Sequence, residues 1–118
     1  MAPTNSNRIT HTSICRNEKV QVFICTPAAI GEKWDNTNDL DPDLNKYSDI
    51  IRKIATTNNC PLVDLRQAFM DYSKENNKDN QAKGILTTDG VHLNKAGNSF
   101  VAQKMYDVLS KNYLKNTQ

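Results

Sequence analysis

Asp89 and His92 are the residues of this sequence whose types and spacing could do chemistry. They lie three positions apart in Thr87–Asn94, a short turn that leads into an apolar-periodic segment. At this spacing the carboxylate can hold one imidazole nitrogen by a hydrogen bond and leave the other nitrogen free. A histidine fixed in this way can act as general base for a serine hydroxyl, and Gly90 would let the backbone turn sharply between the two residues.

The same pair also fits simpler roles, because Asp-x-x-His can be only a surface hydrogen bond or a helix-start motif. None of the candidate serines lies in the glycine-flanked sharp turn that presents a nucleophile. A metal or hydrolytic site that combined His11 with His92 would require the two to meet in space, and no further ligand cluster accompanies them. We therefore expect no metal and no cofactor. The serines without a glycine-flanked turn are Ser13, Ser48, Ser73, Ser99 and Ser110.

The elements that must position the turn alternate between strands and helices. Val20–Cys25 is apolar on both faces and predicts a parallel strand covered on both sides, and a second short strand is expected over 60–64. Asp41 followed by Pro42 predicts a capped helix that runs to about Thr57. Further helices are expected over 65–76 and after Asn94, which is well placed as a cap. The order predicts an α/β fold with parallel strands joined by a right-handed helical crossover.

The chain divides into a weakly patterned segment, residues 1–19, and a domain over 20–118. Each predicted helix of the domain carries one apolar face. In the first segment Ile9 and Ile14 hint at a short helix. The expected buried positions recur at spacings of three and four. They are Leu44, Tyr47, Ile51 and Ile54 in the first helix, Leu65, Ala68, Phe69 and Tyr72 in the second, and Val101, Met105, Val108 and Leu109 in the last.

Composition excludes several classes of function. The 118 residues are 37% hydrophobic with a dispersed net charge of +2, so nucleic acid is not an expected partner. No apolar run approaches the roughly 20 residues of a membrane span, and the first residues lack a secretory pattern. Three cysteines, Cys15, Cys25 and Cys60, lack metal-ligand spacing and predict buried free thiols in a reducing compartment. A cytoplasmic location is the default expectation, although a leader could precede a sequence that is the back half of a longer protein.

Two stretches of the sequence resemble blocks of the SGNH (GDSL-type) hydrolases. Leu86–Gly97 is similar to the final block, in which the catalytic acid and base are written Asp-x-x-His. Cys25–Glu32 resembles the Thr-Pro-x-x-Ile-Gly-Glu segment that follows the fourth strand in many of these proteins. The helix over 47–54 and the strand over 62–65 follow in the family's order, so the similarity covers about residues 20–113.

The resemblance implies the C-terminal part of a three-layer α/β/α flavodoxin-like fold, with two parallel strands and flanking helices. It implies an ester hydrolase of the serine esterase or lipase type, with His92 as general base and Asp89 as the carboxylate that orients it. The family's Gly-Asp-Ser nucleophile block, its oxyanion glycine and its Gly-x-Asn block match nothing in this sequence. We therefore expect no activity from this chain alone. The complete enzyme is expected to act on a small ester, and the absence of an extended apolar surface favours short acyl or acetyl esters over long-chain lipids.

The alternative function is a non-catalytic binding or interaction module, a degenerate relative that kept the scaffold. It predicts an exposed sheet edge that is covered by a partner or by a second copy of the chain. Three other residues have structural roles as their first interpretation. Trp34 is expected to be a half-buried packing residue rather than the wall of an acyl pocket, Asp64 to cap the following helix, and Cys25 to be an unreactive core thiol.

Overall fold

The computed structural model describes residue 15 and residues 19–117. The predicted helix around Ile9 and Ile14 lies outside these residues, as does His11. The described chain is an α/β structure with two parallel strands and flanking helices. Its elements, in chain order, are β1 (Ile24–Cys25), α2 (Asp41–Thr57), β2 (Leu62–Val63), α3 (Leu65–Asn76) and α4 (Lys95–Thr117).

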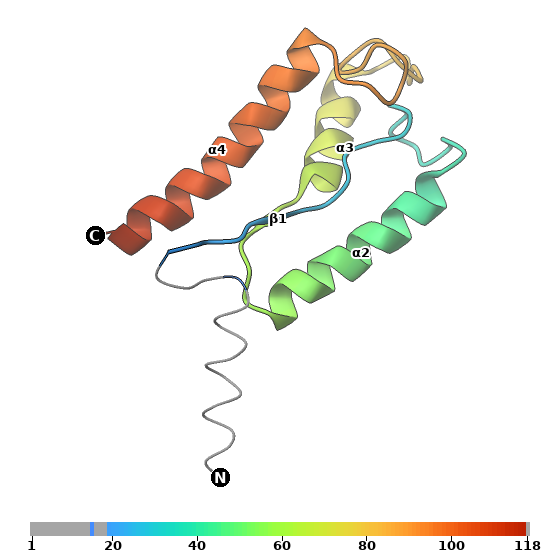
Figure 1. Ribbon diagram of the computed structural model, residues 1–118. Coiled ribbons are helices and arrows are strands. Elements are labelled where there is room, and N and C mark those ends of the chain that lie inside the picture. The colour runs from blue at the N-terminus through green and yellow to red at the C-terminus, as the bar shows by residue number, and fades with distance from the viewer. Residues whose placement is uncertain (1–14, 16–18, 118) are drawn as a thin grey trace.

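The two strands form a parallel pair, as predicted, in which Ile24 lies opposite Leu62 and Cys25 opposite Val63. Helix α2 packs against β1, whereas α4 packs against β2 and α3, so α2 and α4 lie on opposite sides of the strands (Figure 1). The predicted strand over 20–25 is wrong in its extent and in its coverage. Val20 and Val22 are 52% and 40% exposed.

Helix α2 begins and ends at the predicted residues, but Asp41 does not cap it. The N-cap is Leu40, which supplies no side-chain hydrogen bond, and Pro42 lies in the first turn. The Asp41 carboxylate is fully buried and pairs instead with Arg66 of α3 at 2.8 Å. It thereby joins the start of α2 to α3. At the other end the helix stops at Thr57 and Asn58 is the C-cap.

The predicted apolar stripe of α2 is correct for Leu44 and wrong for two of its other members. The buried face runs through Leu44, Ser48 and Ala55, while Tyr47 and Ile54 are 56% and 46% exposed. Two of the buried positions, Ser48 and Ala55, each lie one residue along from a predicted one. Ala55 packs with Ile24 of β1, and apolar periodicity could not reveal that small and polar side chains occupy this buried face.

The other two helices follow their predicted faces more closely. In α3, Leu65 and Phe69 are buried, and Tyr72 stacks edge-on with Phe100 of α4. Along α4 the expected positions Val101, Met105 and Val108 are half-buried, whereas Leu109 is 42% exposed. None of the described helices is long and apolar enough to cross a bilayer.

Cys15 and Cys60 form a disulfide, which contradicts the prediction of three free thiols. Their Cα atoms are 5.4 Å apart, and both pack in a buried cluster with Ala55, Ile24 and Leu62. An odd number of cysteines separated by long gaps gives no sign of which two will meet. Cys25 is the free one, and burial raises the pKa of its thiol, so the prediction that Cys25 is unreactive agrees with its surroundings.

Candidate active site

The structure brings Asp89 and His92 together as their spacing predicts. The imidazole Nδ1 of His92 lies 2.7 Å from Asp89 Oδ2. The other carboxylate oxygen accepts the backbone N–H groups of Val91 at 2.9 Å and of His92 at 2.7 Å. The carboxylate therefore closes a turn and holds the ring at the same time.

These contacts decide the charge on Asp89. The backbone N–H of His92, then its ring, then the N–H of Val91 hold the pKa of Asp89 well below its usual range. Asp89 is thus a carboxylate, an acceptor only, at any ordinary pH. His92 is 80% exposed, and within the described chain its Nε2 makes no hydrogen bond. The outward nitrogen is free to accept a proton.

The turn that carries the pair is closed by backbone contacts. Thr88 donates its N–H to the His92 carbonyl at 2.9 Å, and Thr87 and Leu93 form an antiparallel bridge. Gly90 has φ +94°, a conformation that L side chains rarely adopt, so the predicted sharp turn at this glycine is confirmed.

Asn94 joins the turn to α4 and caps that helix as predicted. Its Oδ1 accepts the N–H of Gly97 at 2.8 Å, while its Nδ2 donates to the carbonyls of Ile85 and Thr87 at 3.2 Å each. A Cβ on Gly97 would lie 2.0 Å from the Leu86 carbonyl oxygen, so only glycine allows the helix to start this close to the loop. The N-terminus of α4 is thereby fastened to the segment that precedes Asp89.

Glu32 is a site residue to which the sequence assigned no role of its own. It is 3% exposed and accepts the backbone N–H groups of Leu86 at 2.7 Å and of Ile85 and Thr87 at 3.1 Å, together with the Thr87 hydroxyl. The signal that could have found it is the Gly31-Glu32 pair inside the segment that resembles a family block. Its burial could not be predicted, because its partners lie 53 to 55 residues away.

A second polar network holds the loop that follows β1. The buried Thr26 accepts the Arg66 N–H at 2.9 Å and donates to Asp64 at 3.2 Å, and Arg66 also reaches the Ala28 carbonyl. Asp64 caps α3 through the N–H of Gln67, as predicted. The network fixes the start of the 27–40 loop relative to α2 and α3.

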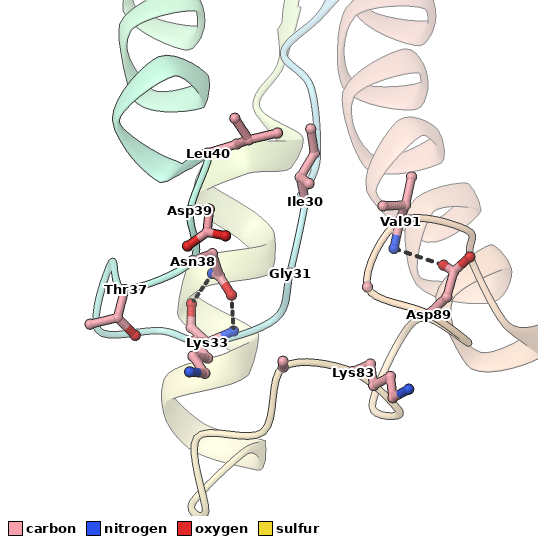
Figure 2. Close-up of a pocket in the computed structure, with 12 residues that line it drawn as sticks. Ile30, Gly31, Lys33, Thr37, Asn38, Asp39, Leu40, Lys83, Asp89 and Val91 are labelled. Carbon is pink, nitrogen blue, oxygen red and sulfur yellow. Dashed lines mark hydrogen bonds between the residues drawn. The ribbon is translucent and has the colours of Figure 1, made fainter.

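An open cavity of about 540 Å³ lies beside the turn, between the 30–40 loop and the 82–91 segment (Figure 2). Asp89, Gly90 and Val91 form the wall on the side of the turn. The facing wall combines apolar Ile30 and Leu40 with polar Lys33, Thr37 and Asn38. Asn38 is hydrogen-bonded to the backbone of Lys33, which shapes that wall.

Trp34 does not belong to this wall. Its indole Nε1 donates to the Asn77 carbonyl at 2.8 Å, and the side chain is half-buried, as expected of a packing residue. Among the described residues no group of three or more histidine, cysteine or acidic side chains could hold a metal. The alternative that combines His92 with His11 rests on a residue outside this part of the chain.

The structure holds an Asp–His pair in the turn before the last helix of an α/β fold, and comparison with known proteins gives the family. The model of the GDSL-like lipase/acylhydrolase family matches residues 6–100, so the chain belongs to this family, whose members hydrolyse esters. The crystal structure of an acetyl xylan esterase, AlAXEase, is similar with a TM-score of 0.75 and 47% sequence identity. The similarity covers 87% of this chain and 54% of that one, so the chain spans about half the length of the esterase. A comparison with curated protein sequences finds no match.

Proposed function

We propose that this chain supplies the general base, His92, and its orienting carboxylate, Asp89, to a serine esterase that cleaves short acyl or acetyl esters. The observation that carries the proposal is the 2.7 Å contact between His92 Nδ1 and Asp89 Oδ2, with the opposite nitrogen open to solvent. Membership of the GDSL-like family supports the ester as substrate class. The nucleophile is a serine outside these 118 residues, since the sequence holds no Gly-Asp-Ser.

In this mechanism His92 Nε2 removes the proton from the serine hydroxyl as the serine oxygen attacks the ester carbonyl. Asp89 keeps the other ring proton on Nδ1 and stabilises the imidazolium that forms. The imidazolium then gives its Nε2 proton to the departing alcohol, which leaves an acyl-enzyme. Water, deprotonated by the same nitrogen, then attacks the acyl carbon. The imidazolium returns this proton to the serine oxygen as the carbon–oxygen bond breaks, which releases the acid and the free serine. The oxyanion donors belong to the family blocks that this sequence does not match, and each such donor contributes about 10²–10³ in rate.

The acyl group is proposed to be acetyl or another short chain. The cavity beside the turn reaches Asp89, Gly90 and Val91 but is not lined by His92, so the choice rests on the comparison. The similar solved structure is described as an acetyl xylan esterase, which supports the same choice.

The test is hydrolysis of nitrophenyl acetate and nitrophenyl octanoate by protein expressed from the natural reading frame that contains this sequence. We expect acetate to be preferred and His92→Ala to lower kcat/KM by about 10⁴-fold or more. His11→Ala is the matched control, because it removes the other histidine. Unchanged turnover in His92→Ala would remove this residue from the mechanism, and an equal loss in His11→Ala would favour a site that uses both.

The 118-residue chain alone tests the assignment of the nucleophile. We expect it to form no acyl-enzyme with an active-site titrant such as nitrophenyl acetate. Acylation of one serine per chain, abolished by His92→Ala, would contradict the proposal that the nucleophile lies outside this sequence.

A further inference from the structure

We propose that Glu32 is a positioning residue for the Asp89–His92 pair and acts on it through the Thr87 hydroxyl; this rests on the function proposed above. Glu32 makes its hydrogen bonds to residues 85–87 rather than to the pair itself. Its effect on the pair therefore passes through the backbone of the turn.

The Glu32 carboxylate dictates the conformation of the segment that precedes the turn. Three successive backbone N–H groups, those of Ile85, Leu86 and Thr87, converge on its two oxygens. Among the ion pairs of the described chain, none includes Glu32. A carboxylate that is 3% exposed without a cation depends on these hydrogen bonds, and the loop that supplies them has little freedom to move.

Thr87 carries this constraint into the turn. Its hydroxyl proton is donated to Glu32, so the hydroxyl oxygen is left to accept, and it accepts the Gly90 N–H at 2.8 Å. The Gly90 carbonyl in turn accepts the N–H of Gly31 at 2.6 Å. Gly31 thus holds the Gly90 carbonyl directly, and Glu32 holds the Gly90 N–H through the Thr87 hydroxyl.

The consequence for catalysis is one of placement. The bonds within the turn align Asp89 with His92 only while Gly90, which lies between them, keeps its conformation. They also do not fix where the pair lies relative to the rest of the protein. A general base needs its proton donor within about 2.6–3.2 Å, and a misplacement of about 1 Å can cost about 10²-fold in rate. The contacts from Gly31 and Glu32 fix the position of Gly90, and with it the position of the Asp89–His92 pair, relative to the segment after β1.

Nuclear magnetic resonance of the ¹⁵N-labelled 118-residue chain tests the proposal without any need for activity. The measured quantity is the tautomer of the His92 imidazole. The ring signals of His92 are identified as those that remain in the spectrum of His11→Ala. We expect the proton on Nδ1 in the unsubstituted chain, and loss of this preference in Glu32→Gln, because the new amide group opposes the converging N–H donors. Thr87→Val, which removes only the hydroxyl, should give the same loss, and Thr87→Ser should restore the preference.

Asp64→Asn is the matched control, because Asp64 also accepts four hydrogen bonds and none of them comes from residues 85–92. A purely structural role for Glu32 predicts that Asp64→Asn and Glu32→Gln behave alike. If Glu32→Gln does not fold, Thr87→Val and Thr87→Ser decide the question. An unchanged His92 tautomer in folded Thr87→Val or Glu32→Gln overturns the proposal.

Kinetics separate this inference from the proposed function. In protein from the natural reading frame, Glu32→Gln should lower kcat by about 10²-fold and leave KM nearly unchanged. If the unsubstituted protein hydrolyses no ester, the proposed function fails while the tautomer still reports on Glu32. If the protein is active and Glu32→Gln matches it in kcat, the positioning role fails and the esterase stands.

Discussion

Asp89 and Glu32 are two carboxylates that shape the same turn from opposite directions. Asp89 is about half exposed and finds its partners two and three residues along the chain. Glu32 is buried and finds its partners 53 to 55 residues away. Each oxygen of either carboxylate accepts at least one hydrogen bond, yet one set of bonds is made within a short loop and the other between two distant loops.

The difference teaches that alignment and placement of a catalytic pair can have separate origins. Local bonds give the Asp89–His92 pair its internal geometry as long as Gly90, between the two residues, keeps its conformation. The long-range bonds of Glu32 decide where that loop sits against the segment after β1. We therefore expect some substitutions to change the free energy of unfolding without changing the geometry of the pair, and others to change both. The disulfide before β2, Glu32 and Asp89 allow this to be tested.

The largest effect on stability should come from the disulfide, and it should leave the turn unchanged. Reduction of Cys15–Cys60, whose partners are 45 residues apart, is expected to lower the free energy of unfolding by about 4 kcal/mol through the entropy of the unfolded chain. Cys60 precedes β2, whereas the turn packs on the loop that follows β1. The folded reduced chain should thus keep the His92 tautomer.

Urea unfolding with and without reductant measures this change. Cys25→Ser is the control, since Cys25 is the free cysteine. Denatured oxidised protein should show one reactive thiol. Three would mean that the disulfide does not form, and a changed His92 tautomer in the folded reduced protein would break the separation between the two ends of the sheet.

Glu32→Leu should have the next largest effect and should alter both stability and the turn. The substitution leaves three backbone N–H groups and the Thr87 hydroxyl without their acceptor. Each buried donor without a partner lowers the free energy of unfolding by about 1–3 kcal/mol. Because the loop can relax toward water, we expect a net loss of about 3 kcal/mol. Asp89→Leu should lower the unfolding midpoint in urea far less, since its partners are already near solvent. Equal shifts for the two variants would contradict the contrast between them.

The sequence predicted what is local and missed what is distant. The Asp89–His92 contact, the Asn94 cap and the end of α2 at Thr57 all follow from spacings of a few residues. The parallel pairing of the two strands also followed, because the strand–helix–strand order has few solutions.

The errors lie where tertiary packing decides the outcome, because packing between distant residues leaves no periodic trace in the sequence. Asp41 was expected to cap α2 and instead pairs with Arg66, 25 residues away. The face of α2 was misplaced because Ser48 is buried and Tyr47 is exposed. The disulfide joins Cys15 to Cys60 across 45 residues of sequence, and Glu32 accepts the N–H of Leu86 across 54.

A smaller effect is expected at Gly90, where the backbone of the turn can be tested directly. Gly90→Ala places a Cβ at φ +94° and 3.3 Å from the Ala82 carbonyl oxygen. We expect a loss of about 1–3 kcal/mol from the backbone conformation, together with a displaced Asp89–His92 pair.

Gly84→Ala is the matched control for this substitution. Gly84 has φ +98°, but a Cβ there would meet nothing closer than the Gln81 side chain at 4.0 Å. Both variants should lose stability in thermal unfolding, and only Gly90→Ala should alter the His92 tautomer. An altered tautomer in both would show that general loosening of the 82–91 segment, rather than the hold on Gly90, disturbs the pair.

The smallest effect should be the acid sensitivity that Asp89 confers. Folding lowers the pKa of Asp89, so the folded protein binds a proton at this carboxyl more weakly than the unfolded chain does. The stabilising contribution is therefore complete above the ordinary aspartate pKa of about 3.9 and is lost progressively as the pH falls below it. Asp89→Asn removes this dependence of stability on pH. The unfolding temperatures of the variant and of the unsubstituted protein should therefore approach each other as the pH is lowered from 5 to 2. Asp79→Asn, on an exposed loop, controls for the change in charge. A difference in unfolding temperature between the two proteins that stays constant over this pH range would mean that the hydrogen bonds to Asp89 do not favour its ionised form. The pair would then lack the fixed charge by which Asp89 orients His92.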